Sequence, residues 1–318
     1  MDSATAAPAP RIVRSGGSRF LRALAGQKDL QLMALLGLAW MVIFNFIPMY
    51  GIVIAFKNYN ILKPIAKAPW VGFEHFREFF TDGSFAKVMR NTLGINGLRL
   101  AIGFPLPIVL AILLSELPWS GYKRAVQTIS YLPHFVSWVI LGGLLINWLS
   151  DVGFLNAILR GLGVIREPIF YLAEPKYFWW IAVLSDVWKE MGWSAIIYLA
   201  AITGIDPQLY EAATIDGASR LQKTTYVTVP CIRGAIAIMF VLTVSYLLNT
   251  NFDQIFVLKN PLNAPASDVI DIYVYRMGLQ SGRFSYSAAI GLFKSIIALF
   301  LLLLSNTVSR RLTGSSIF

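Results

Sequence analysis

Several charged side chains interrupt stretches of the sequence that are otherwise apolar enough to cross a membrane. Asp186, Lys189 and Glu190 are spaced so that a helix places all three on one face. A charged side chain at the centre of a bilayer costs about 2.5–3.5 kcal/mol, and such groups therefore pair with one another or line a water-filled cavity. The spacing predicts either a buried network of ion pairs that fixes helix register or part of a path for a polar solute.

Two other apolar stretches carry charges at a similar depth. At 1.5 Å per helical residue, Arg99, Asp186 and Lys294 each lie about 12–14 Å into their stretches, close to the midplane of a hydrocarbon core about 30 Å thick. We expect these charges to meet around a shared interior. The aromatic and polar side chains expected to extend a solute path from there are Trp193, Asn249 and Asn251. Membrane aromatics more often pack or anchor at interfaces, so a structural role for the tryptophan stays open.

Six stretches have the length of about 20 mostly apolar residues that a membrane-spanning helix requires. They cover approximately residues 32–55, 91–114, 126–149, 177–202, 232–249 and 285–308. Pro105 and Pro107 are expected to kink the second stretch. Only 14% of the residues are charged and 56% are apolar, which is too few charges for the surface of a soluble protein of this size. The sequence therefore predicts an all-α membrane protein with six spans and both termini on the same side.

The basic residues outside the spans orient the chain only weakly. With both termini in the cytoplasm, the inner and the outer segments each hold eleven Lys and Arg residues. Five basic residues before the first span, together with Arg310 and Arg311 after the last, favour cytoplasmic termini. The expected organisation is a tail at 1–30, a first transmembrane helix at 31–56, an extracytoplasmic loop at 57–89, a five-helix core at 90–308 and a tail at 309–318.

The residue inventory excludes several kinds of chemistry. The single cysteine, Cys231, and two distant histidines match no zinc-binding spacing, so no metal site is expected. The sequence contains neither a GxxxxGK[ST] phosphate loop nor a GxSxG nucleophile elbow. The net charge of +10 is spread between the apolar stretches, which argues against nucleic-acid binding. An intramembrane enzyme stays open, but no residues stand out as a nucleophile and its base. We therefore expect a transporter or channel subunit or a membrane scaffold, non-catalytic and with no cofactor of its own.

The loop between the fourth and fifth spans holds the most specific pattern. Asp206 followed by Pro207 is typical of a helix start, and Gly217 offers the left-handed residue that ends a helix. A second amphipathic stretch, residues 219–229, is expected to end at Pro230. The pattern predicts a helix, a tight turn and a second helix, with two small alanines near the tip. Such a loop either lies on its own bundle or lets the groove of another protein approach its backbone.

The order Glu211-Ala212-Ala213, three residues and then Gly217 resembles the EAA motif of permease subunits of binding-protein-dependent ABC importers. In that family the motif docks into a cleft of the ATPase subunit and couples nucleotide-driven closure to the membrane helices. The resemblance implies that the ATPase-coupling residues are Glu211, Ala212, Ala213, Asp216 and Gly217. Val229 replaces the usual leucine before the proline, and Thr224 stands where the sugar-transporting branch commonly has phenylalanine.

Other short matches occur in the family's order and spacing. They are residues 70–76 (WVGFEHF), 91–93 (NTL), 153–156 (GFLN), 251–256 (NFDQIF) and 268–276 (DVIDIYVYR). Together they resemble the branch that imports oligosaccharides and polysaccharide fragments, and within it the first permease subunit of bacterial alginate importers.

The resemblance implies the six-helix type I ABC importer permease architecture, with an EAA coupling loop at 205–230, in a bacterial inner membrane. The chain would form half of the path for an oligosaccharide or polysaccharide fragment, an acidic one such as alginate being a candidate. Its partners would be a second homologous permease, two ATPase subunits that bind ATP and Mg²⁺, an extracytoplasmic solute-binding protein and membrane lipid. The alternatives are an ion-coupled secondary transporter of a small polar solute, which could use the midplane acids, and a non-transporting membrane scaffold.

Overall fold

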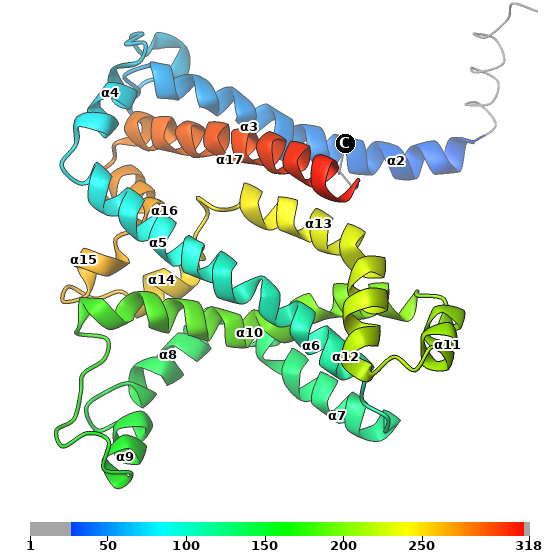
Figure 1. Cartoon of the computed structure of the whole chain (residues 1–318). Coiled ribbons are helices and arrows are strands. Elements are labelled where there is room, and N and C mark those ends of the chain that lie inside the picture. Colours follow the sequence, from blue (N-terminus) through cyan, green and yellow to red (C-terminus); the bar gives the residue numbers. More distant parts are fainter. Residues whose placement is uncertain (1–26, 315–318) are drawn as a thin grey trace, which may run out of the picture. The chain divides into compact units, whose positions relative to one another are not determined.

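The computed structural model describes residues 27–314, in which every regular element is a helix (Figure 1). The only β-type pairing in that range is an isolated bridge between Lys57 and Trp70. Most of the expected N-terminal tail, residues 1–26, and the last four residues of the C-terminal tail lie outside the described residues. The chain divides into two compact units, Met1–Val53 and Ile54–Phe318.

The first unit contains one long apolar helix. It is built from α2 (Lys28–Met41), the π-helical turn η1 (Val42–Phe46), α3 (Ile47–Met49) and most of η2 (Tyr50–Phe56). Residues Asp29–Phe56 are long and apolar enough to span a membrane, which confirms the first predicted stretch. The π-helical turn ends two residues before Pro48. Proline lacks an amide hydrogen and clashes with the carbonyl of the preceding turn, and the wider turn relieves both effects.

The second unit holds all the remaining elements. Its first part comprises η3 (Ile65–Lys67), α4 (Glu74–Thr81), α5 (Phe85–Gly103), α6 (Pro105–Ser115), α7 (Ser120–Tyr131), η4 (Leu132–Phe135), α8 (Trp138–Trp148) and α9 (Phe154–Gly161). Its second part comprises α10 (Pro175–Thr203), α11 (Pro207–Ile215), α12 (Arg220–Lys223), η5 (Thr224–Thr228), α13 (Val229–Ser245), α14 (Phe252–Leu258), α15 (Ala264–Ser267), α16 (Ile270–Tyr275), η6 (Arg276–Gln280) and α17 (Phe284–Thr313).

Helix α10 is the central element of this unit (Figure 1). It packs against α5 and α6, while α13 packs against α17. Phe178 and Val183 from its first half and Tyr198 from its second half belong to two separate apolar clusters. Gly192 lets α10 approach α7 closely, because a Cβ there would lie 2.0 Å from the carbonyl oxygen of Ser130. The unit is therefore assembled around the helix that carries most of the predicted midplane charges.

Four helical segments within residues 27–314 are long and apolar enough to cross a membrane. They are Asp29–Phe56, Phe85–Ser115, Arg220–Ser245 and Phe284–Arg311. Helix α10 has 29 residues but is not among these segments, because Asp186, Lys189 and Glu190 lie close together in its middle. The predicted third stretch, 126–149, is not one straight helix, because Ser120–Phe135 and Trp138–Trp148 are bent by 98°. The hydroxyl of Ser137 caps the second of these helices.

The prolines in the other spans act differently from one another. The second stretch breaks where a kink was predicted, since α5 ends at Gly103 and α6 begins at Pro105. By contrast, the prediction that the helix ends at Pro230 is wrong. Residues Arg220–Ser245 are continuous and pass the proline through the π-helical turn η5, in the same way as the first helix passes its own proline.

Candidate functional site

Arg99 on α5 and Asp186 on α10 form an ion pair between the two helices. Nε of Arg99 lies 2.8 Å from Oδ2 of Asp186, and the two side chains are 21% and 11% exposed. The two terminal guanidinium nitrogens of Arg99 donate hydrogen bonds to Oδ1 of Asn96 at 3.3 Å and to Oε1 of Gln254 at 3.2 Å. Gln254 is fully buried and donates to the backbone of α10 at Ala182, 2.6 Å away. The short helix α14, which carries Gln254, is thereby tied to this pair.

A small cavity lies beside the pair. Its volume is about 150 Å³ and its walls come from α5, α6, α10 and α13. Arg99, Asp186, Glu190 and Thr243 supply polar groups to the lining. Sites for small molecules usually measure about 300–1,000 Å³, so the cavity has room for a few water molecules in this conformation. A larger solute would not fit unless the surrounding helices moved apart.

Lys189 and Glu190 belong to a second cluster that also contains His134. Nζ of Lys189 donates to the backbone carbonyl of His134 at 2.6 Å and to Oε1 of Glu190 at 3.0 Å. Nδ1 of His134 lies 2.7 Å from Oε2 of Glu190. Trp193 stacks on the imidazole of His134 with ring centroids 4.4 Å apart. The predicted aromatic residue is therefore engaged with a protein ring, and 44% of its surface remains exposed.

Lys294 does not join either of these clusters. It forms an ion pair with Asp271 of α16, which also accepts hydrogen bonds from the backbone amide and the hydroxyl of Thr250. The midplane charges thus sort into three separate clusters, and the expectation of one shared meeting point is wrong for Lys294. Equal depth along a helix gives no information about which neighbour a side chain faces.

The two predicted asparagines lie in the segment between α13 and α14. Both are half-buried. Asn251 caps α14, its Oδ1 accepting from the amide of Gln254 at 3.4 Å, and its side chain lies close to Asp186. Asn249 lies in the turn that follows α13, where its amide donates to the carbonyl of Tyr246 at 2.8 Å. The structure therefore joins Asn251 to the Arg99–Asp186 pair.

The loop between α10 and α13 has the helix–turn–helix geometry that the sequence predicted. Asp206 caps α11, accepting at its carboxylate from the amide of Gln208 at 2.9 Å. At the other end, Gly217 has a φ of +75°. The amide of Ala218 donates to the carbonyl of Ala213, and that of Gly217 to Thr214. This is the Schellman pattern, which closes a helix with a left-handed residue.

The surface of this loop is unusually apolar for a segment between spans. Ile215 is 87% exposed and Leu221 is 75% exposed. Among the predicted coupling residues, Glu211, Ala212, Asp216 and Gly217 are exposed and Ala213 is half-buried. Large apolar side chains beside small exposed ones are typical of a surface that another protein covers.

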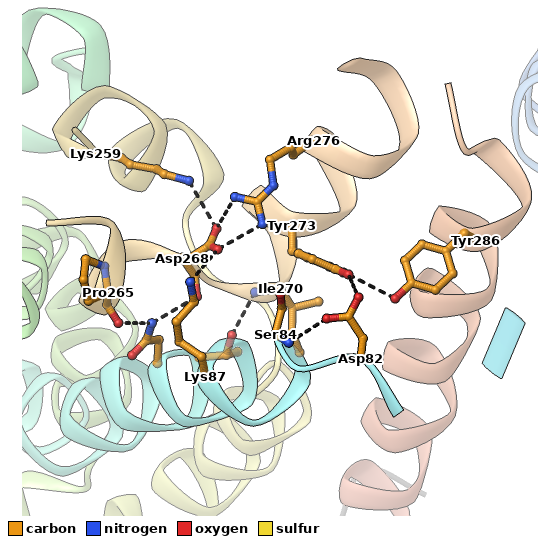
Figure 2. Close-up of polar contacts among 12 residues, drawn as sticks. Asp82, Ser84, Lys87, Lys259, Pro265, Asp268, Ile270, Tyr273, Arg276 and Tyr286 are labelled. Carbon is orange, nitrogen blue, oxygen red and sulfur yellow. Dashed lines mark hydrogen bonds and ion pairs between the residues drawn. The ribbon is translucent and has the colours of Figure 1, made fainter. Parts of the chain in front are cut away.

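A fourth polar group, centred on Asp268, was not predicted as a site from the sequence (Figure 2). Its carboxylate is 2% exposed and lies between three cations from three elements. The ammonium groups of Lys259 and Lys87 lie 3.1 and 3.4 Å from this carboxylate. The guanidinium of Arg276 donates a hydrogen bond to each of its two oxygens, at 3.1 and 3.0 Å. Burial acts to raise the pKa of Asp268, but the hydrogen bond and charge of Arg276 and the charge of Lys259 outweigh it, so the pKa lies below its usual value.

Two residues of the NTL segment hold the strand-like chain around Asp268 in place. The amide of Asn91 donates to the carbonyls of Pro265 and Asp268, at 3.0 and 3.1 Å. The hydroxyl of Thr92 accepts from the amide of Ile270 at 2.9 Å. The family-like segments 91–93 and 268–276 are therefore in direct contact. Both segments match the family pattern, and their joint occurrence is the sequence signal that could have indicated a contact between them.

Residues 103–314, more than half of the chain, match the family described as "binding-protein-dependent transport system inner membrane component". The chain belongs to this family. It is 41% identical over 301 residues to the polygalacturonan/rhamnogalacturonan transport system permease protein YteP of Bacillus subtilis, covering 94% of this chain and 93% of that protein. It is 37% identical over 311 residues to protein LplB of the same organism, covering 98% and 97%.

Two solved structures are also similar to the permease. One is a bacterial ABC transporter involved in the import of the acidic polysaccharide alginate, with 40% identity, a TM-score of 0.85, and coverage of 93% of this chain and 99% of the other. The second is an alginate ABC transporter in complex with an alginate pentasaccharide-bound periplasmic protein, with 39% identity, a TM-score of 0.86, and coverage of 94% and 100%. The resemblance to carbohydrate importer permeases is confirmed, and no comparison favours an ion-coupled transporter.

Proposed function

We propose that the permease forms one half of the transmembrane path of an ATP-driven importer of an oligosaccharide or polysaccharide fragment. Two similar proteins carry the names of acidic saccharides, polygalacturonan and alginate. The substrate proposed for this chain is therefore a saccharide that bears carboxylates. The other half of the path is a second, homologous permease, because the uneven set of midplane charges on this chain needs a different partner surface to complete it.

The coupling loop carries the proposal. Helix α11 is short, capped at both ends and flanked by the exposed side chains of Ile215 and Leu221. A short helix that is capped at both ends behaves as a rigid unit. A displacement of α11 is therefore transmitted to α10 and α13, which line the midplane cavity. Two ATPase subunits, which bind ATP and Mg²⁺, cause that displacement at Glu211–Gly217.

The proposed topology places six spans in a bacterial inner membrane with both termini in the cytoplasm. Four apolar helices, the bent pair and the charged α10 make up the six. The proposed boundaries are those of the sequence: tails at 1–30 and 309–318, a first span at 31–56, an outer loop at 57–89 and a five-helix core at 90–308. A solute-binding protein docks on the extracytoplasmic side, and alternating closure of the ATPases turns the cavity outward and inward.

The test is crosslinking from the loop to the ATPase subunits of the same cell. Ala212 is the better position for a cysteine because it is exposed, whereas Ala213 is half-buried. The native Cys231, which is exposed, is first changed to serine. We expect Ala212→Cys to crosslink with a yield that changes on ATP addition. Leu262→Cys, which is exposed in the loop between α14 and α15, should give no crosslink. A loop that is reactive to cytoplasmic reagents but forms no crosslink contradicts the coupling role.

A functional variant completes the test. Glu211→Lys reverses the charge of an exposed residue, so membrane insertion and folding should stay intact while uptake is abolished. The measurement is saccharide uptake in cells together with the amount of permease in the membrane. The matched control is Gln208→Lys, which adds a charge to the exposed first turn of the same helix. Uptake at the wild-type rate in Glu211→Lys overturns the proposed coupling.

A further inference from the structure

The three cations around Asp268 are not balanced by acidic groups. Within residues 27–314, Asp268 is the only carboxylate in ion-pair contact with Lys87, Lys259 or Arg276. One negative charge therefore faces three positive charges. Burying a carboxylate needs one well-placed cation, and the hydrogen bonds from Arg276 already satisfy both of its oxygens. The two lysines exceed what the burial of Asp268 requires.

Two of these cations retain unused hydrogen-bond donors. An ammonium has three N–H groups and a guanidinium has five. Lys259 donates one to Asp268, and Arg276 donates two. Their side chains are 20% and 34% exposed, so the remaining donors can reach a ligand. The guanidinium also lies 5.3 Å from the ring centroid of Tyr273, which fixes its position. The donors are thus held in place before any ligand binds.

Lys259 and Arg276 open into one pocket of about 320 Å³. The two cations are the only charged groups in its lining, and Asn260 and Gln280 add neutral polar groups. Phe256 and Tyr275 supply two rings, with centroids 5.4 Å apart and planes at 79°. The cations can bind a carboxylate, and the rings can cover the apolar face of a sugar. A uronic acid residue has both features.

The place of the pocket in the chain agrees with this ligand. It is formed by residues between α13 and α17, whereas α11, which carries the tip of the coupling loop, precedes the other end of the continuous helix Arg220–Ser245. That helix is about 39 Å long at 1.5 Å per residue. In the proposed topology it crosses the membrane, which places the pocket and the coupling loop on opposite sides. Helix α14 further links the two polar sites, since Gln254 binds Arg99 and Phe256 lines the pocket.

We propose that the pocket formed by Phe256, Lys259, Tyr275 and Arg276 binds a carboxylated sugar residue of the saccharide on the extracytoplasmic side, before the saccharide enters the midplane cavity. The inference rests on the proposed import function and names a binding site for its substrate. The alternative occupant is an acidic side chain of the solute-binding protein. The pair of rings and the size of the pocket favour a sugar.

The experiment compares Lys259→Gln with a matched control, Lys87→Gln. Both variants remove one positive charge from the same carboxylate and leave the Arg276 contacts in place, but only Lys259 lines the pocket. The complete importer with its binding protein is placed in liposomes. Initial uptake is measured for a galacturonic acid pentasaccharide and for its fully methyl-esterified, neutral form. An alginate pentasaccharide serves as a second acidic probe.

We expect Lys259→Gln to raise the KM for the acidic saccharides about tenfold, which corresponds to the loss of one charge-assisted contact of about 1.4 kcal/mol. The KM for the esterified saccharide should change less than about twofold, and Lys87→Gln should change neither. As a second variant, Phe256→Leu should raise the KM for the acidic and the esterified forms alike, because stacking does not depend on charge.

Several outcomes overturn the inference while leaving the import function intact. These are an unchanged KM in Lys259→Gln, an equal effect of both lysine variants, and an equal effect of Lys259→Gln on the acidic and esterified forms. Weaker docking of the empty binding protein to Lys259→Gln assigns the pocket to that protein and also overturns the inference. If the wild-type importer takes up none of these saccharides, the proposed function fails together with the inference.

Discussion

Two groups of buried charges in the permease differ in their balance of positive and negative side chains. In the interior between α5 and α10, Arg99 faces one carboxylate, Asp186, and donates a hydrogen bond to the side-chain oxygen of Gln254. Around Asp268, three cations surround one carboxylate, and two of them open into a pocket. In a balanced pair the two charges compensate each other and leave little net charge for a ligand. An unbalanced group keeps positive charge and hydrogen-bond donors available. This difference distinguishes a structural ion pair from a site that can bind an anion.

The largest effect is expected from removing one member of the balanced pair. Arg99→Leu leaves the Asp186 carboxylate without its counter-ion, which costs about 3–5 kcal/mol for a buried pair. The double variant Arg99→Leu/Asp186→Leu should recover most of that loss, because an apolar pair of similar size replaces the ions. Thermal unfolding of the purified complex measures both. A double variant as unstable as the single one contradicts the view of a self-contained pair.

The same double variant also tests whether the pair belongs to the solute path. If it folds and assembles but loses uptake, Arg99 and Asp186 contact the saccharide as well as each other. Uptake at the wild-type rate assigns them a structural role only.

An intermediate effect is expected at the centre of the unbalanced group. Asp268→Asn leaves the charges of three cations uncompensated and should cost about 1.5–3 kcal/mol, the range for hydrogen bonds to charged groups. The effect depends on pH. Because the pKa of folded Asp268 lies below its usual value of 3.8, its contribution is complete above about pH 5 and is lost as the pH falls through the lowered pKa.

Unfolding midpoints measured between about pH 3 and pH 7 check this dependence. The midpoint of the wild-type permease should fall more steeply in acid than that of Asp268→Asn. Asp82 is still present in the variant and keeps some acid dependence. Burial acts to raise the pKa of Asp82, but hydrogen bonds from Ser84 and Tyr273 favour its charged form, so its pKa is also lowered. Parallel curves for the two proteins argue against Asp268 as the titrating group.

The smallest effect is expected at the outer edge of the same group. Lys87 is 41% exposed and contacts Asp268 at 3.4 Å, so Lys87→Gln should change the free energy of unfolding by no more than about 1 kcal/mol. Chemical unfolding at low and at high salt provides the measurement. A loss above 2 kcal/mol would show that all three cations are needed to bury the carboxylate and that none is in excess.

Much of the architecture followed from local patterns. Asp206, Pro207 and Gly217 predicted both ends of α11, because caps and left-handed residues act over a few bonds. The limits of local reasoning appear in the predicted third stretch and at Pro230. The third stretch was expected to be a single span, yet Ser120–Phe135 and Trp138–Trp148 are bent by 98°. The helix that was expected to end at Pro230 passes this proline with a wider turn.

The class of molecule, the helix–turn–helix loop after α10 and the family could all be predicted from the amino acids, because composition, apolar length and a spaced motif are properties of the chain alone. Which charges are partners followed from the three-dimensional packing. Lys294 lies at the predicted depth of Arg99 but pairs with Asp271, and Asp268 gathers cations from residues 87, 259 and 276. Helical periodicity gives the height and the face of a side chain. The neighbour that it meets depends on how helices far apart in the sequence are rotated against one another.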